Sequence, residues 1–136
     1  MALALFNPFN QTIDDIADGK HNLSTDTFKF LLTNVAPVAT NSVRADLTEI
    51  AAGNGYTAGG VALTIASSSQ TGGAFTWVGG NSPVVTAAGS AIAQFRYLAL
   101  YNDTAVGKNL IGWYDYGVAI DLADGESLTI NASGVT

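Results

Sequence analysis

The stretch AIAQFRYLALYND, residues 91–103, has the clearest strand pattern of the chain. Side chains two positions apart lie on the same face of a β-strand. One face would therefore carry Phe95, Tyr97 and Tyr101, and the other Ile92, Arg96, Leu98 and Leu100. Because large apolar side chains occupy both faces, we expect both faces to be covered, as in a central strand of a β-sandwich.

Shorter segments with similar alternation lie on both sides of this strand. In residues 26–34, DTFKFLLTN, one side carries Phe28, Phe30 and Leu32 and the other Lys29, Leu31 and Thr33. Further strands are predicted at residues 60–67, 74–78, 83–89 and 127–134, and residues 110–122 form either a strand pair or one long bent strand. Strands spaced roughly 8–12 residues apart, with Gly- and Asn-rich turns, predict a single all-β domain, residues 1–136, of β-sandwich or jelly-roll type.

One short helix is predicted near the N-terminus. Ile13 and Ile16 recur at the spacing of one helix face, and Gly19 is placed to end the helix. One or two turns is all that this pattern supports.

The composition favours a protein that packs against others. Of the 136 residues, 48% are hydrophobic and 12% are charged, about half the usual charged share. Five basic and eleven acidic residues give a net charge of −6. The basic residues are scattered, so no stripe is available for a phosphate backbone, and we expect no nucleic-acid partner.

The chain has no cysteine, which excludes disulfides, thiolate metal sites and a cysteine nucleophile. Its first ten residues, MALALFNPFN, are apolar but lack the basic region of a secretion signal. No segment approaches the roughly 20 apolar residues of a membrane helix. We therefore expect a protein made in the cytoplasm, with no membrane partner.

The glycine-rich stretch DLTEIAAGNGYTAGG, residues 46–60, invites comparison with a phosphate-binding loop. Such a loop needs its glycines between a strand and a helix, so that helix N–H groups meet the phosphate. Here a strand is predicted after Gly60, and no Lys-Ser or Lys-Thr pair completes a P-loop. Asn54-Gly55 and Gly59-Gly60 are turn and bend signals. We interpret the loop as architecture and predict no cofactor.

The carboxylates form no recognisable acid–base or metal-binding motif. Asp46 and Glu49 can share one helical turn, as paired catalytic carboxylates would, but nearby Arg44 favours a solvated turn. The aspartates of residues 14–18 lack the spacing and the distant Glu of a calcium-binding loop. We predict no metal site.

His21 is the only histidine, so a Ser-His-Asp arrangement would have to use it. Ser24 and Asp26 are too close in sequence to indicate such a triad, and no G-x-S-x-G elbow occurs. We predict no catalytic residue. An enzyme would require His21 and a carboxylate to meet in a cleft.

The aromatic cluster GWYDYG, residues 112–117, has three interpretations. Trp113, Tyr114 and Tyr116 can belong to the core with one amphipathic flank, form a protein-contact surface, or form a sugar-stacking platform. Aromatic residues on adjacent strands are more often core, and a contact surface is the next interpretation.

Several segments taken together resemble a family of small virion proteins of tailed bacteriophages. They are LFNP (5–8), LSTDTFKFLLTN (23–34), DLTEIAAGNGYTAGG (46–60), FRYLALYNDTAVGKNLIGWYDYG (95–117) and LADGESLTI (122–130). The resemblance spans nearly the whole chain. It implies a β-rich subunit present in many copies on the particle, with no enzymatic activity and no cofactor.

The resemblance leads to a capsid decoration or cement protein as the expected function. Such a protein would lie on the capsid surface and bind between major capsid protein subunits, through many weak contacts. Its partners would be the major capsid protein and sister subunits, with a homotrimer as one arrangement. The predicted contacts are the arm of residues 1–9, the loop at residues 36–42, and the side chains Leu3, Leu5, Phe6, Phe9, Trp113, Tyr114 and Tyr116.

Three other functions remain open at this stage. One is an enzyme that uses His21 and a carboxylate in a cleft. A tail or head–tail connector subunit has the same composition and differs in copy number. A receptor- or glycan-binding module would place Trp113, Tyr114 and Tyr116 around a shallow groove.

Overall fold

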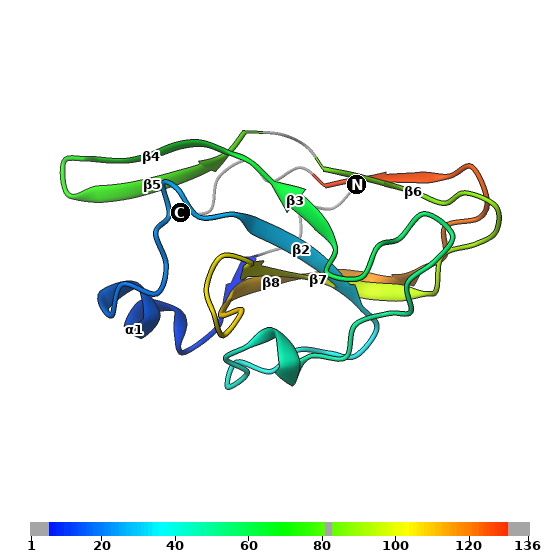
Figure 1. Ribbon diagram of the computed structural model, residues 1–136, viewed down its shortest axis with the longest axis horizontal. Helices are drawn as coiled ribbons and strands as arrows, with labels where there is room; N and C mark the ends of the chain where they lie inside the picture. The colour runs from blue at the N-terminus through cyan, green and yellow to red at the C-terminus, as the bar shows by residue number, and fades with distance from the viewer. Residues whose placement is uncertain (1–5, 81–82, 131–136) are drawn as a thin grey trace.

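The computed structural model describes residues 6–80 and 83–130. The elements in these residues are, in chain order, β1 (Phe6–Pro8), α1 (Thr12–Ala17), β2 (Phe28–Thr33), η1 (Arg44–Asp46, a 3-10 helix), β3 (Val61–Leu63), β4 (Ile65–Thr71), β5 (Ala74–Gly79), β6 (Val84–Thr86), β7 (Phe95–Asn102), β8 (Leu110–Ile120) and β9 (Ser127–Thr129). Strands dominate, and α1 lies near the start of the chain (Figure 1). The predicted mainly-β fold with a short N-terminal helix is confirmed.

Five strands form a central antiparallel sheet in the order β1-β8-β7-β2-β3. β7 pairs with β8 on one side and with β2 on the other, so that Leu100 lies opposite both Gly112 and Phe30. The other described strands form two ribbons, β4–β5 and β6–β9. The segment with the strongest strand pattern is therefore a central strand, as predicted.

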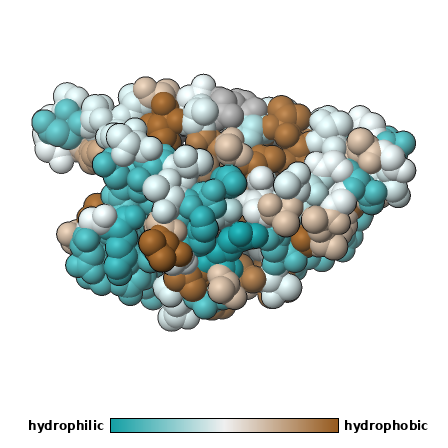
Figure 2. All heavy atoms as spheres, viewed as in Figure 1, coloured by the Kyte–Doolittle hydropathy of each residue, from teal (hydrophilic) through white to brown (hydrophobic). Residues whose placement is uncertain are grey.

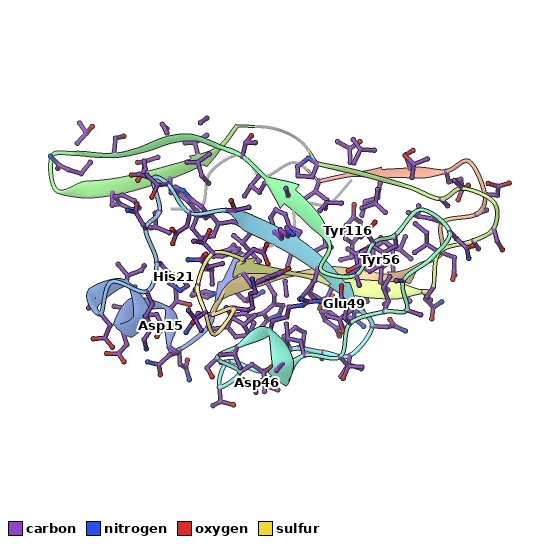
Figure 3. All side chains as sticks on the ribbon, in the orientation of Figure 1. Asp15, His21, Asp46, Glu49, Tyr56 and Tyr116 are labelled. Carbon is purple, nitrogen blue, oxygen red and sulfur yellow. The ribbon has the colours of Figure 1, made fainter. Side chains whose placement is uncertain are left out.

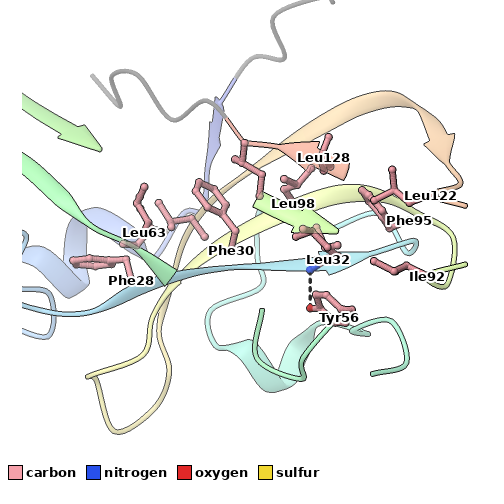
Figure 4. Close-up of a cluster of buried hydrophobic side chains, with 14 of the residues drawn as sticks. Phe28, Phe30, Leu32, Tyr56, Leu63, Ile92, Phe95, Leu98, Leu122 and Leu128 are labelled. Atoms are coloured by element: carbon pink, nitrogen blue, oxygen red, sulfur yellow. Dashed lines mark hydrogen bonds between the residues drawn. The ribbon is translucent and has the colours of Figure 1, made fainter. Parts of the chain in front are cut away.

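Apolar side chains cover both faces of β7. On one face a first cluster joins sheet residues to residues of the two ribbons, among them Phe28, Phe30, Leu98, Leu100, Trp77, Val85 and Leu128 (Figure 4). On the other face a second cluster contains Phe9, Leu31, Ala99, Tyr101 and Leu110. The sheet and the ribbons thus form a two-layer, sandwich-like arrangement.

Phe95 departs from the predicted alternation of β7. The strand pattern places it with Tyr101, but it packs in the first cluster with Leu98 and Leu100. The pairing of β7 with β8 is irregular between Phe95 and Tyr97, where extra residues of β8 are accommodated. Phe95 is also the first residue of β7 and lies beyond the last pair with β2, Thr33 with Tyr97, so no regular pairing fixes the face of its side chain.

The strand predicted at residues 60–67 is in fact two strands. β3 pairs with β2 in the central sheet, whereas β4 pairs with β5, and Thr64 lies between them. The β4–β5 hairpin extends beyond the end of the central sheet (Figure 1). Trp77 anchors its base, because the indole N–H donates to the Leu23 carbonyl at 2.8 Å and the ring packs edge-on against Phe28.

Residues 110–120 form one long strand, which decides between the two predicted alternatives. β8 continues through Gly117, whose φ of +86° is a conformation that glycine adopts readily. After it, Asp124-Gly125 turns the chain into β9, as predicted.

α1 turns polar side chains toward the protein. Thr12 and Asp15 are buried, while Ile13 and Ile16 are 73% and 39% exposed. Gly19 follows the helix with a φ of +74°. The helix is therefore predicted correctly from the isoleucine spacing, although the isoleucines do not form its buried side. Within the described residues no helix has the length and apolarity to cross a membrane.

Candidate functional site

Glu49 joins the glycine-rich loop to the central sheet. Its Oε1 accepts hydrogen bonds from the Tyr56 hydroxyl at 2.7 Å and the Gly59 N–H at 2.6 Å. Its Oε2 accepts one from the Arg44 guanidinium at 2.6 Å. The Tyr56 oxygen in turn accepts the Leu32 N–H of β2 at 3.1 Å (Figures 3 and 4). One carboxylate therefore fastens the loop to the sheet.

These contacts keep Glu49 ionised. Burial alone would raise the pKa of the carboxyl group, but the donors Arg44, Tyr56 and Gly59 outweigh it and hold the pKa below its ordinary value. Burial raises the pKa of Tyr56, and it raises that of Tyr101 to about 12, so both phenols keep their protons at neutral pH. A carboxylate already bound by three donors is suited to holding the loop rather than to accepting a substrate proton.

The predicted solvated turn describes Asp46 but not Glu49. Asp46 is exposed, and its carboxylate accepts the N–H groups of Ser42 at 2.8 Å and Val43 at 3.2 Å. The Glu49 side chain is only 17% exposed. The two carboxylates therefore have separate structural roles and do not form an acid–base pair.

The glycines of the loop serve backbone geometry, as predicted. Gly60 has a φ of +84°, and a Cβ there would collide with the Phe30 carbonyl of β2. Gly55 has a φ of +98°, and a Cβ there would collide with the Thr86 carbonyl of β6. Both positions need the positive φ and the close approach that glycine allows.

His21 meets carboxylates inside the protein. Its side chain is fully buried, and Nε2 lies 3.9 Å from Oδ2 of Asp15 (Figure 3). Its Nδ1 lies 3.2 Å from the Asn102 amide nitrogen, which also donates to Asp26 at 2.6 Å. No motif in the sequence indicates this convergence, because α1, the following loop and β7 bring the groups together only in the folded protein.

Asp15 is a buried carboxylate with donors on both oxygens. Its Oδ1 lies 2.8 Å from the Lys20 ammonium, and its Oδ2 accepts the Asn109 amide at 2.8 Å. Burial alone would raise its pKa, but these hydrogen bonds outweigh burial, so that the pKa lies below its ordinary value. Asp15 therefore stays ionised and ties α1 to the start of β8.

Asn102 fixes the tautomer of His21. Its Oδ1 accepts the N–H groups of Thr104 at 2.9 Å and Ala105 at 3.1 Å, so its NH2 group must face the imidazole. Nδ1 is then the acceptor and the proton sits on Nε2, which has no well-formed hydrogen bond within the described residues. Burial lowers the pKa of His21, and the neighbouring carboxylates offset this only in part.

This buried cluster is built for structure. A general base has to reach the proton that it removes, and the imidazole of His21 has no exposed surface. The described residues contain no group of three or more His, Cys, Asp or Glu side chains arranged to hold a metal ion.

The aromatic residues of 112–117 divide between the two faces of β8. Trp113 packs against the second cluster, with its ring centroid 4.6 Å from that of Phe9. Tyr114 packs against the first cluster and lies 5.2 Å from Phe6, and Tyr116 also packs there. Because neighbouring residues of a strand point to opposite faces, the three aromatic side chains do not form one sugar-stacking platform.

The predicted contact arm is described from Phe6 onward, and Leu3 and Leu5 lie outside the described residues. Phe6 belongs to β1, which pairs with β8, and its side chain is half-buried. Phe9 is only 2% exposed. The prediction that Phe9 is a surface contact is therefore wrong, because its side chain packs in the protein's own second cluster.

The loop at residues 36–42 keeps an exposed apolar side chain. Val38 is 54% exposed, while the Ala39 carbonyl accepts the Asn10 N–H at 2.9 Å. The loop is thus held beside the N-terminal segment.

Two shallow depressions flank the turn between β7 and β8. One, of about 500 Å³, includes Lys20 and Asn109, and the other, of about 380 Å³, includes Arg44 and Lys108. Their cationic side chains are each paired within the chain, and Lys108 lies 3.0 Å from Asp103. The depressions therefore offer no unpaired cation to an anionic ligand.

The surface is divided between a charged side and an uncharged layer. Residues 50–95 contain no Asp, Glu, Lys, Arg or His, and their described part includes the strands β3, β4, β5 and β6. We call the described residues of this run the uncharged layer. The four strands lie along the upper side of the view in Figure 1. In the same view in Figure 2, pale and brown residues predominate in the middle of this upper side, whereas teal, hydrophilic residues gather over α1. The run is visible in the sequence, but motifs and hydrophobic periodicity do not report where charged residues are missing.

No protein-family model, curated protein or solved structure matches this chain.

Proposed function

We propose that this chain is a structural subunit of a tailed-bacteriophage particle, a capsid decoration protein that binds between major capsid protein subunits. The uncharged layer is the observation that carries the proposal. Phe75 and Val84 are 49% and 51% exposed within it, among Ser, Thr, Gly and Ala residues. The resemblance of the sequence to small virion proteins supplies the kind of particle.

A surface that another protein covers loses its contact with water, and this has a free-energy cost for polar and charged groups. Burying a charged group costs several kcal/mol unless it is paired, and the centres of protein interfaces are accordingly depleted of charge. The uncharged layer contains no charged side chain, so another protein can cover it without this desolvation penalty. The side with α1 carries exposed ion pairs such as Lys20–Asp18, which suit a surface that stays in water.

A capsid lattice makes modest contacts sufficient. Each subunit can touch several neighbours at once, and linked sites raise the overall affinity without stronger individual contacts. The sandwich-like arrangement gives the subunit a fixed shape, and the uncharged layer gives it a surface to bury.

Purified particles provide the test. We expect an antibody against this chain to label the heads of gradient-purified virions, with a copy number comparable to that of the major capsid protein. Val84→Lys places a charge in the uncharged layer and should reduce rebinding of the purified protein to particles. Val118→Lys, at a residue that is 66% exposed on β8, is the matched control and should bind as the wild type does.

The outcomes separate the candidate functions. Label confined to tails, at a few copies per particle, would replace the decoration role by a tail or connector role. Absence of the chain from particles would overturn the proposal. The glycan-binding alternative is not carried forward, because Trp113 and Tyr114 lie on opposite faces of β8.

A further inference from the structure

The β4–β5 hairpin has two strand edges that pair with no other described strand. β4 spans Ile65–Thr71 and β5 spans Ala74–Gly79, whereas β1, β3, β6 and β9 span three residues each. An unpaired edge presents a row of N–H and C=O groups to which another strand can add. Each of those four short strands also has an unpaired edge among the described strands, but the edges of the hairpin are about twice as long.

Proteins usually protect such an edge with charged side chains or proline. The hairpin sequence IASSSQTGGAFTWVG contains neither. A register irregularity occurs between Ile65 and Ser67, at the base of β4, and the pairing from Ser67 to Thr71 is regular up to the turn. The outer part of β4 is thus left open to pairing by its sequence and by its geometry.

The charge distribution indicates which partner fits this edge. The chain carries a net charge of −6, so two copies repel each other wherever their charged sides approach. The hairpin lies inside the uncharged layer, where two copies can meet without this repulsion. An uncharged edge of one copy is therefore complementary to the same edge of another.

We propose that the β4–β5 hairpin is an assembly arm, and that β4 of one copy pairs antiparallel with β4 of a second copy. β4 forms the outer margin of the hairpin in Figure 1. Pairing two identical edges about a twofold axis gives a closed contact and a continuous four-stranded sheet. The backbone groups of both edges then gain partners. This inference rests on the proposed function only in naming a sister subunit as partner.

Sedimentation or light scattering of the purified full chain, over a range of concentrations, tests the proposal. We expect reversible dimers. Ser69→Lys, at an exposed position of β4, places like charges on both sides of the axis and should raise the dimer dissociation constant roughly tenfold. Thr76→Lys changes the residue opposite Ser69, on β5, and is the matched control that should dimerise as the wild type does.

A charge-swap experiment makes the test independent of any loss of folding. Ser69→Lys and Ser69→Asp should each dimerise poorly alone, and a mixture of the two should recover dimers. In hydrogen exchange, the amides of residues 65–71 should become slower as the concentration rises, while those of α1 should not change.

Three results would overturn the inference. They are a wild-type chain that stays monomeric at every concentration, dimers that tolerate Ser69→Lys, and dimers without added protection of residues 65–71. If the chain is monomeric but is found on virions, only this inference is wrong. If the chain dimerises but is absent from virions, only the proposed function is wrong.

Discussion

Glu49 shows how one side chain can hold a long loop that has little regular structure. The loop's N–H groups and hydroxyls need partners once they leave water, and an ionised carboxylate accepts several of them at once. Glu49 takes the Tyr56 hydroxyl, the Gly59 N–H and the Arg44 guanidinium. Its effect on stability should therefore exceed that of an ordinary surface acid.

Replacing Glu49 by Gln tests this role. The substitution keeps the size of the side chain but removes the charge and one acceptor oxygen, so donors are left unsatisfied. We expect the free energy of unfolding in urea to fall by about 2 kcal/mol. Glu126→Gln, at an exposed turn residue, is the control and should change it by less than about 0.5 kcal/mol. Equal effects of the two variants would contradict the role given to Glu49.

His21 should make stability depend on pH in the weakly acidic range. Burial lowers its pKa in the folded protein below the ordinary value of 6.5, so the unfolded chain takes up the proton more readily. Stability is then unaffected above about pH 6.5 and falls as the pH decreases below it. The carboxylates Glu49 and Asp15, whose pKa values are lowered, add a second loss only below their ordinary values of 4.5 and 3.8.

Urea unfolding of the wild type and of His21→Gln between pH 7.5 and pH 5, an interval of roughly 2.5 units around the ordinary histidine pKa, measures this dependence. His21 is the only histidine, so the variant should have an almost flat profile in that interval. A wild-type profile that is equally flat would show that the imidazole titrates normally.

At the scale of secondary-structure elements, the glycine loop crosses the sheet so closely that one position has no room for a side chain. Gly60 and Gly72 both have positive φ, but a Cβ at Gly60 would collide with the Phe30 carbonyl, whereas nothing lies within 4 Å of a Cβ at Gly72. The pair therefore separates steric collision from backbone strain.

We expect Gly72→Ala to lower the free energy of unfolding by about 1 kcal/mol, the usual cost of a left-handed residue with a side chain. Gly60→Ala carries that cost and also forces the loop away from β2, and we expect a loss of at least about 3 kcal/mol. Thermal or urea unfolding of both variants measures the difference. Similar losses would mean that the loop can shift without effect.

The elements were largely predictable from sequence, and their faces only in part. Alternation in residues 26–34 gives both faces of β2 correctly, because that strand pairs regularly along its length. The same rule fails at Phe95, which lies at the end of β7, beyond the pairing with β2 and where the pairing with β8 is irregular. It also misses the break at Thr64, since a strand that changes partner keeps its alternating pattern.

The candidate sites were harder to predict for a related reason. Asp15 and His21 are near each other in the sequence, but Asn102 is 81 residues away from His21, and only the tertiary structure joins them. The aromatic cluster was visible, yet its division between two faces becomes certain only once β8 is one continuous strand. Motifs report residue types, whereas burial and contact come from tertiary structure.

At the scale of the whole molecule, stability should decrease from the central sheet outward. β7 has strand neighbours on both sides and apolar clusters on both faces, while the β4–β5 hairpin extends beyond the sheet. Backbone amides exchange slowly where opening requires many contacts to break.

Hydrogen exchange on a dilute sample, which keeps the chain monomeric, checks this order. We expect the amides of β2 and β7 to exchange slowest and those of residues 65–79 to exchange among the fastest. Slow exchange of the hairpin amides in the dilute monomer would contradict this order, because contacts inside one chain would then stabilise the hairpin.

The uncharged layer has a further consequence for how a particle would keep or lose this protein. Contacts made without ions have nothing for dissolved salt to screen. Raising the salt concentration should therefore not detach such a subunit, whereas agents that solvate apolar groups and backbone, such as urea, should detach it.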